Sequence, residues 1–385
     1  GSLAVQFPDL IFLFAFPFVL WHYREKLFAV GPLLWIGVLY VGANVLSAWI
    51  SGSTSALVES LARGYLLFLG FWMAAWVREG GRSKDLLNKI SNFVILITSA
   101  WALLSVLAYL LYITGLSEYG AKSYESYPYV GGFPRISGGA ITPNMFLYTL
   151  APALFFSALR YFFHGKYLVC FLILSLAAGL TLSKDLLILI VFLIALFSYS
   201  KGWNSASAKY FLVFFAGLLL FIVSHFVWIP TEAPTQPQQY NYHAGTAILQ
   251  TEGGGIYGSH HLFLKKANVH LFKANPWFGV GPGLSKTYLS DLQAKGIYPA
   301  HFPAYEPHSS LLGAASETGL FGLLSLLLLI GYSVHRLLPL AHTSDPTLRA
   351  LVYFLLFLLL SSVQQDVMNF RFLWVIWGVL LGVGR

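Results

Sequence analysis

The run Phe93-Val-Ile-Leu-Ile-Thr-Ser-Ala-Trp-Ala-Leu-Leu-Ser-Val-Leu-Ala-Tyr-Leu-Leu-Tyr-Ile113 contains no charged residue. A helix that crosses a lipid bilayer needs about 20 mostly apolar residues, and this run provides them. A membrane β-strand would alternate apolar and polar side chains, which this run does not do. Because the bilayer core offers no water to the backbone, a segment of this kind satisfies its own hydrogen bonds as a helix.

Similar runs recur along the whole chain. Of the 385 residues, 57% are hydrophobic and only 10% are charged, whereas soluble domains carry about 25% charged residues. The composition therefore excludes an ordinary soluble domain and predicts an all-α polytopic membrane protein with about 11–12 transmembrane helices. The expected spans lie near residues 7–22, 27–50, 61–77, 91–114, 143–163, 165–182, 185–200, 210–228, 308–334, 348–363 and 370–384.

Basic residues indicate the orientation of these helices, because short cytoplasmic loops carry an excess of Lys and Arg. Alternate short connections, counted with the adjoining helix ends, carry twelve basic residues on one side and five on the other. The twelve are Arg24, Lys26, Arg78, Arg82, Lys84, Lys89, Arg160, Lys166, Lys201, Lys209, Arg336 and Arg349; the five are Arg63, Lys122, Arg135, Lys184 and Arg371. We expect the N-terminus outside and the C-terminus inside. An outside N-terminus without a signal sequence suggests a further helix upstream of this chain.

One connection, residues 229–306, is much longer than the others and falls on the outer side. Loops longer than about 15 residues are usually functional or disordered. Within it, the apolar residues from His260 to Lys273 recur at helical spacing, which predicts an amphipathic helix at the outer membrane surface. The glycine-rich run 275–283 follows no strand, so we interpret it as a structural turn rather than a phosphate loop. The expected organisation is eight helices in 1–228, a large outer loop in 229–306 and three helices in 307–385.

Polar residues gather at the expected start of the ninth helix, Pro307-His308-Ser309-Ser310. Proline suits the first turn of a helix. At 100° per residue, Gly319 and Gly322 would lie within about 40° of the direction of His308. Another helix could then pack against the glycines and hold His308 at the outer rim. Glu317, about 13 Å deeper at 1.5 Å per residue, is expected to be buried and hydrogen-bonded in a structural role.

The element His308-Ser309, nine residues, then Gly319-Leu-Phe-Gly322 resembles the signature of the O-antigen ligase family. Relatives of that family are the O-antigen polymerases and the O-linking oligosaccharyltransferases. The run Pro276-Trp-Phe-Gly-Val-Gly-Pro-Gly283 before the histidine, and Arg135-Ile-Ser-Gly138 followed by Thr142-Pro-Asn144, resemble the same superfamily. The resemblance extends over about residues 130–330. It implies a membrane glycosyltransferase of the GT-C-like type, with its site facing the periplasm.

The resemblance implies transfer of a glycan from undecaprenyl diphosphate to a hydroxyl of the lipid A–core oligosaccharide, at the outer face of the bacterial inner membrane. His308 would be the general base, because an imidazole with a pKa near 6.5 can take a proton from the acceptor hydroxyl at neutral pH. A single displacement would invert the anomeric centre. The outer segments hold no Asp-x-Asp pair, so we expect neither a metal nor another cofactor.

The leaving diphosphate needs fixed cations. The family carries an Arg where this chain has Lys184, and a second Arg early in the long loop, at the position of either His260 or His261 in this chain. Lysine binds phosphate as a point charge without the bidentate fork of arginine. The residues expected to contact diphosphate or glycan are Lys184, Arg135, His260, His261, Arg63 and Arg371, with Ser309, Gly319 and Gly322 supporting helix packing.

For each of these residues, a structural role stays open at this point. Lys184 could pair with Asp185 in a hairpin, and Arg135 could be an ordinary loop residue. Arg63 and Arg371 lie near outer helix ends, where long basic side chains commonly extend to the interface. His308 could be an interfacial histidine hydrogen-bonded to water or to a carbonyl.

Two other functions also stay open. A polymerase or a protein O-oligosaccharyltransferase would share the catalytic half and differ in its acceptor groove. A transporter would instead show repeated halves, broken helices at the membrane midplane and deeply placed ionisable residues. The sequence shows no repeat, and its polar residues concentrate near the outer rim.

Nucleic acid is not an expected partner, because the net charge of +8 is spread over many loops. Cys170, alone in an apolar run, is expected to be a structural thiol.

Overall fold

The computed structural model describes residues 7–28, 31–79, 83–127, 131–140, 142–161, 164–200, 219, 226–230 and 242–383. Helices form at ten of the eleven apolar runs, and the run near 210–228 lies almost entirely outside the described residues. These helices are α1 (Phe7–Phe28), α2 (Pro32–Ser51), α3 (Thr54–Glu79), α4 (Ser83–Ile113), α5 (Pro143–Tyr161), α6 (Tyr167–Leu180), α7 (Asp185–Ser200), α11 (Ser310–Leu337), α12 (Pro346–Ser361) and α13 (Arg371–Val383).

Four of the described helices, α2, α3, α4 and α11, are long and apolar enough to cross a membrane. Helices α6, α7, α12 and α13 are apolar but shorter. On α2, Trp35 is 67% exposed and Trp49 is 80% exposed, about 21 Å apart along the axis at 1.5 Å per residue. Tryptophans commonly mark the two interfaces of a bilayer. These features support an all-α membrane protein.

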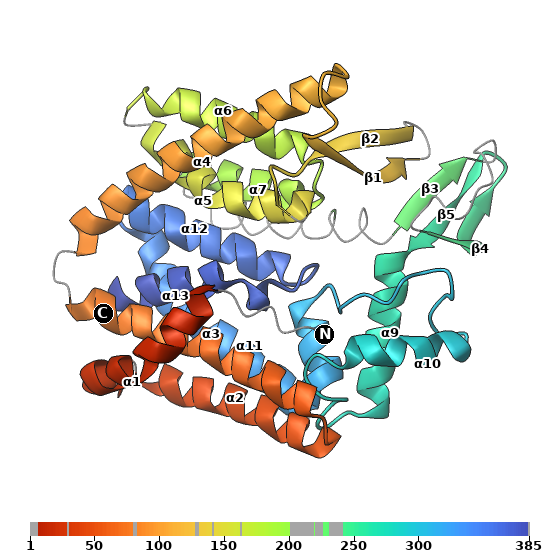
Figure 1. Ribbon diagram of the computed structural model, residues 1–385, viewed down its shortest axis with the longest axis horizontal. Helices are drawn as coiled ribbons and strands as arrows, with labels where there is room; N and C mark the ends of the chain where they lie inside the picture. The colour runs from red at the N-terminus through yellow and green to blue at the C-terminus, as the bar shows by residue number, and fades with distance from the viewer. Residues whose placement is uncertain are drawn as a thin grey trace.

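The centre of the bundle is formed by α5 and α12 (Figure 1). Phe155 on α5 and Phe354 on α12 are both fully buried, and their ring centroids lie 6.0 Å apart. Phe357, one turn further along α12, contacts Phe155 at 6.2 Å and Tyr148 at 5.8 Å. Close packing of these rings fixes the positions of α5 and α12 relative to each other.

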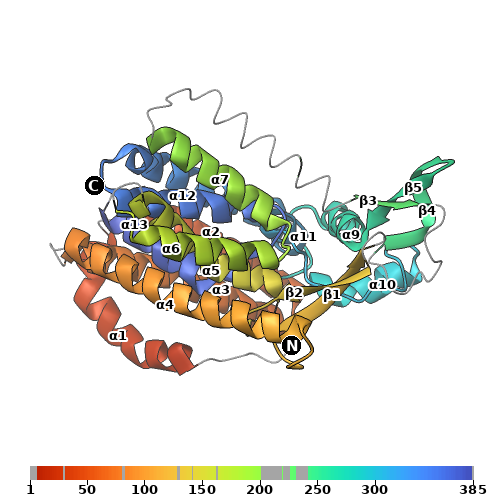
Figure 2. The same ribbon diagram turned by 90° about the horizontal axis from the view of Figure 1, so that it is seen from above.

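Two small antiparallel sheets lie at one end of the helical bundle, where α9 and α10 are also found (Figure 2). Strands β1 (Ala121–Tyr127) and β2 (Gly131–Ile136) form a hairpin, and β3 (Phe226–Pro230), β5 (Gly254–Ser259) and β4 (Tyr242–Thr251) form a sheet in that spatial order. The sequence did not predict these strands. All of these strands pair in antiparallel fashion. They are held by backbone hydrogen bonds to one another, which a local sequence pattern does not reveal.

The predicted amphipathic helix is present as α9 (His260–Ala274). Its apolar residues Leu264, Ala267 and Leu271 are buried against residues that follow in the same outer segment, including Val280 and Tyr298. The segment also contains η2 (Ser285–Tyr288) and α10 (Leu289–Ala294). The apolar face of α9 therefore packs into a second, smaller core, whereas the sequence suggested that it rests on the membrane surface.

Helix α11 is broken at Gly319, which has φ 67° and ψ −161°. Residues 276–281 run beside the break and pair with its backbone. Val280 N and Gly281 N donate to the carbonyls of Ser316 and Glu317, and Leu320 N donates to the carbonyl of Pro276.

These bonds use N–H groups that a phosphate loop would need, which supports the structural interpretation of the run 275–283. A Cβ at Gly319 would overlap the backbone of Trp277, and one at Gly279 would overlap the backbone of Glu317. Both positions have positive φ, and both therefore require glycine.

Candidate functional site

The end of the bundle that carries the sheets also carries His308. Helix α11 begins at Ser310, and the side chain of Ser309 caps it by accepting a hydrogen bond from Leu312 N at 3.3 Å. His308 therefore lies just before the N-cap, two residues ahead of the first helical residue. The angular relation expected between His308, Gly319 and Gly322 is absent, since the helix changes course at Gly319.

His308 has φ 28°, and Leu182 in the turn between α6 and α7 has φ 47°; in the part of the chain that the structure describes, these are the non-glycine residues with positive φ. Such conformations cost free energy in residues with a Cβ, and they are enriched at functional sites. The two strained residues belong to segments that meet at one place, as the following contacts show.

Three histidines gather there. His260 and His261 open α9, and their ring centroids lie 3.9 Å apart. The ring of His308 lies 6.3 Å from that of His260 and 5.4 Å from that of His261. The ring of Tyr305 contacts both His260, at 5.5 Å, and His308, at 5.6 Å. We call His260, His261 and His308 the histidine cluster.

Two lysines act on the histidine cluster electrostatically. The pKa of His260 is lowered to about 3, first by burial and then by His308 and Lys184. The pKa of His308 is also lowered, first by burial and then by Lys265. At neutral pH both imidazoles are therefore uncharged, so His260 does not supply the cation that the family resemblance assigned to its position. The positive charges at this site come from Lys184 and Lys265.

Lys265 was not predicted as a site residue. Its ammonium donates to the carbonyl of Val363 at 3.2 Å and to Gln364 Oε1 at 2.9 Å. Burial lowers its pKa to about 8. Lys265 follows His261 by four residues on α9, and residues so spaced share one face of a helix. That spacing is the signal that could have identified it.

Arg135 positions the turn that carries Lys184. Its Nε donates to the carbonyl of Thr181 at 2.7 Å, and its Nη2 donates to Asn144 Oδ1 at 3.1 Å. The side chain is 7% exposed. Arg135 is thus a buried structural residue rather than an open loop cation, and it connects the end of β2, the start of α5 and the turn 181–184. Asp185 beside this turn accepts a hydrogen bond from Tyr148 at 2.7 Å.

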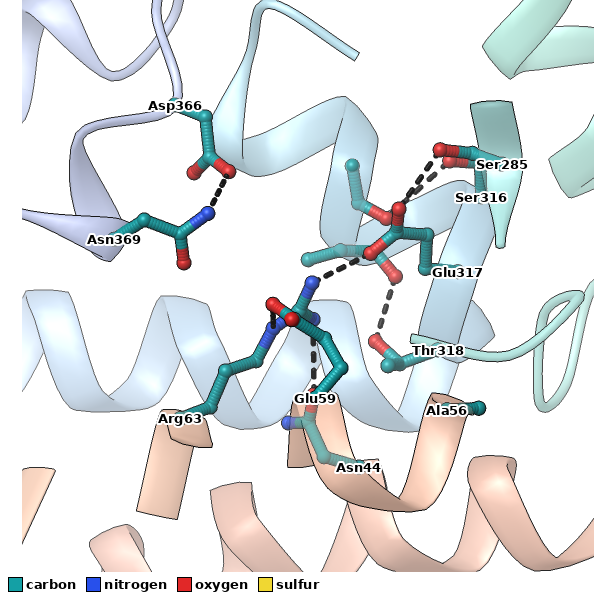
Figure 3. Close-up of polar contacts among 12 residues, drawn as sticks. Asn44, Ala56, Glu59, Arg63, Ser285, Ser316, Glu317, Thr318, Asp366 and Asn369 are labelled. Carbon is teal, nitrogen blue, oxygen red and sulfur yellow. Dashed lines mark hydrogen bonds and ion pairs between the residues drawn. The ribbon is translucent and has the colours of Figure 1, made fainter. Parts of the chain in front are cut away.

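Arg63 lies in a different polar network, shown in Figure 3. Its Nη2 is 2.6 Å from Glu317 Oε2, and its Nε is 3.4 Å from Glu59 Oε1. Nη1 donates to Asn44 Oδ1 at 3.0 Å. Glu317 also accepts from Ser285 Oγ at 2.7 Å. The sequence-based view that Glu317 is buried and hydrogen-bonded is confirmed. The donors of Arg63 are engaged by protein groups, which favours a structural role.

Arg371 is the first residue of α13 and is half-buried. Of the residues that the sequence singled out, the structure therefore brings Lys184, His260, His261 and His308 together. Arg135 supports that group, and Arg63 does not belong to it.

Comparison with known proteins adds no assignment. Neither a scan against protein-family models nor a search of curated proteins found a match to this chain.

Proposed function

We propose that this chain is a membrane glycan ligase. It transfers a glycan from undecaprenyl diphosphate to a hydroxyl of lipid A–core oligosaccharide at the periplasmic face of the inner membrane. The observation that carries the proposal is the histidine cluster itself, which brings His308 against the start of α9. The charges of Lys184 and Lys265 act on this cluster. The twelve-to-five distribution of basic residues supports a periplasmic location for this end of the bundle.

The proposed mechanism assigns the base role to His308. Because its pKa is lowered, its imidazole is uncharged at neutral pH and can accept the proton of the acceptor hydroxyl. The acceptor oxygen forms a bond to the anomeric carbon as the bond from that carbon to the diphosphate oxygen breaks. The configuration inverts, and the departing diphosphate keeps the electron pair. Lys184 and Lys265 stabilise the charge that develops on it.

A transporter is the second candidate, since the break in α11 and the buried Arg63–Glu317 pair are features associated with that class. The backbone groups at the break, however, are hydrogen-bonded to residues 276–281. Backbone groups that are paired in this way are less suited to coordinate a transported ion than the open carbonyls of an unwound helix. We therefore favour transfer chemistry at the histidine cluster.

The test uses the purified chain with radiolabelled lipid-linked glycan and either lipid A–core or additional lipid-linked glycan as the acceptor. A ligase labels lipid A–core, whereas a polymerase produces longer lipid-linked glycan. His308→Ala should reduce transfer by about 10²–10⁴-fold, the usual worth of a general base. His270→Ala is the control, because His270 is exposed on the same helix as His260 and His261. Near-normal turnover by His308→Ala would remove His308 from the mechanism, and labelling of neither acceptor would contradict glycan transfer.

A further inference from the structure

The arrangement of ring nitrogens in the histidine cluster resembles that of a metal site. One ligand atom from each of His260, His261 and His308 lies within 4.8 Å of the other two. In a tetrahedral zinc site with Zn–N bonds of about 2.0–2.1 Å, two ligand nitrogens lie about 3.4 Å apart. The nitrogens therefore need to approach by at most about 1.5 Å, which small rotations of the side chains can provide.

His260 adds an independent observation. Its side chain is 7% exposed, and its Nδ1 is a buried atom with no hydrogen-bond partner. Buried polar atoms in native proteins nearly always have a partner, and an exception calls for an explanation such as a bound ion. The rings of His261 and His308 both lie close to this residue. A ligand held between the three rings and bound through Nδ1 of His260 would satisfy the buried nitrogen.

We propose that the histidine cluster is a binding site for a divalent transition-metal ion, with Zn²⁺ as the best fit. Three imidazoles with an open fourth position are a common donor set for zinc, and imidazole also suits copper and nickel. The described part of the chain brings no carboxylate into this group of ligands, which disfavours Mg²⁺ and Ca²⁺ because they prefer oxygen ligands.

Lys184 and Lys265 oppose a dication through their charge and favour an anion as the fourth ligand. The site should therefore bind metal more weakly than three histidines without neighbouring cations.

The metal would be an inhibitor rather than a cofactor of the proposed transfer. A neutral imidazole has one nitrogen lone pair that can accept a proton. His308 needs this lone pair to take the proton of the acceptor hydroxyl, and a coordinated metal would occupy it. This consequence rests on the proposed function, whereas the metal site itself does not.

The binding test titrates Co²⁺ into the purified chain, prepared without a polyhistidine tag, and records visible absorption. Cobalt replaces zinc in such sites and gives strong bands when it is tetrahedral. We expect saturable bands for the unaltered chain and for His270→Ala. His261→Ala and His308→Ala should weaken binding by at least 10-fold, because even indirect changes around a metal site cost about 10–100-fold. Zn²⁺ should displace the cobalt.

Thermal unfolding with and without Zn²⁺ is the second readout, and it shows whether each variant is folded. A zinc-dependent rise in the unfolding temperature of His270→Ala, absent from folded His261→Ala, supports the site. Equal Co²⁺ binding by all variants, or no saturable binding, overturns it.

Zinc inhibition of transfer that a chelator reverses supports the inhibitory role. Metal binding without any transfer by the metal-free protein would leave the site standing and contradict the proposed function. If His308→Ala loses transfer but the unaltered chain binds no metal, the proposed function stands and the metal site is contradicted.

Discussion

Arg63 Nη2 lies 2.6 Å from Glu317 Oε2, and this ion pair connects α3 to a point two residues before the break in α11. Glu317 is 3% exposed. Removing one partner of a buried ion pair leaves an uncompensated charge, and the usual cost is about 3–5 kcal/mol. Each charge therefore depends on the other, and the loss of either one would destabilise the junction between the N-terminal helices and α11.

We expect Arg63→Met to lower the free energy of unfolding by about 3–5 kcal/mol. The double variant Arg63→Met, Glu317→Leu should recover most of that loss, because neither charge is then buried alone. Chemical unfolding in detergent measures the free energy of unfolding of the single and the double variant. The matched control is Lys89→Met, which removes the exposed pair between Lys89 and Asp85 on α4 and should have little effect. A double variant as unstable as the single one would show that the unpaired charge of Glu317 is not the cause of the loss.

Gly319→Ala should prevent correct folding of α11. The substitution places a Cβ at a residue with φ 67°, where it meets the backbone of Trp277. Gly331→Ala on the same helix is the control, because a Cβ there meets nothing within 4 Å, and alanine favours a helix by about 1 kcal/mol over glycine. Monodisperse yield after detergent extraction and the unfolding temperature report the result. Similar behaviour of the two variants would contradict the requirement for glycine at the break.

Asp366 should make stability depend on pH. Burial raises its pKa to about 6, although Arg63 and the hydrogen bond from Ser310 Oγ act in the opposite direction. The folded protein then holds a proton between about pH 4 and 6 that the unfolded chain has released. Stability therefore falls as pH rises through that window. At most about 3 kcal/mol is involved.

Asp366→Asn should remove this part of the pH dependence. The measurement is the difference between variant and unaltered protein in the free energy of unfolding, at pH 4.5 and at pH 7.5. We expect the variant to gain stability relative to the unaltered protein as pH rises. A difference that stays constant with pH would show that the carboxyl group does not titrate in this window.

Lys184 tests the proposed diphosphate contact. Lys184→Arg should preserve or raise transfer, since the planar guanidinium offers a second hydrogen bond to an anion. Lys184→Gln should weaken donor binding and slow turnover. The assay follows transfer against donor concentration, with Lys295→Gln in exposed sequence after α10 as the control. Small and equal effects of the Arg and Gln variants would assign Lys184 a structural role in the turn.

Topology can be measured with single cysteines in a Cys170→Ser background. Lys295→Cys, beside α10, should react with a membrane-impermeant maleimide added to intact spheroplasts. Ser344→Cys, between α11 and α12, should react only after the membrane is opened. Both positions are exposed in the structure. Labelling of both cysteines from the same side would contradict the orientation inferred from the basic residues.

The helices were the most predictable part of the fold, because each span needs only local apolar composition. Strand β5 escaped prediction, since Gly254-Gly-Ile-Tyr-Gly-Ser259 shows little apolar alternation and depends on β3 and β4 for pairing. The break in α11 also depends on a distant segment. Helical periodicity continues through Gly319, and only the backbone of residues 276–281 explains why the helix opens there.

The candidate site was predictable where a motif carried the information. Lys184, His260, His261 and His308 were named from the resemblance, and the structure places them together. Arg63 was named from its position near a helix end, and its pairing with a residue 254 positions away could not be read from local pattern. Neutral His260 was unexpected because burial, which lowers its pKa, is a property of the assembled fold.

The backbone pairing between residues 276–281 and 316–321 has a consequence for protein engineering. Each segment supplies hydrogen-bond partners that the other lacks, and Gly279 and Gly319 each fit only the backbone opposite. A chimera that exchanges the outer segment for that of another protein must exchange α11 with it. Transplanting the outer segment alone would separate the two halves of one junction and leave peptide groups without partners in the interior.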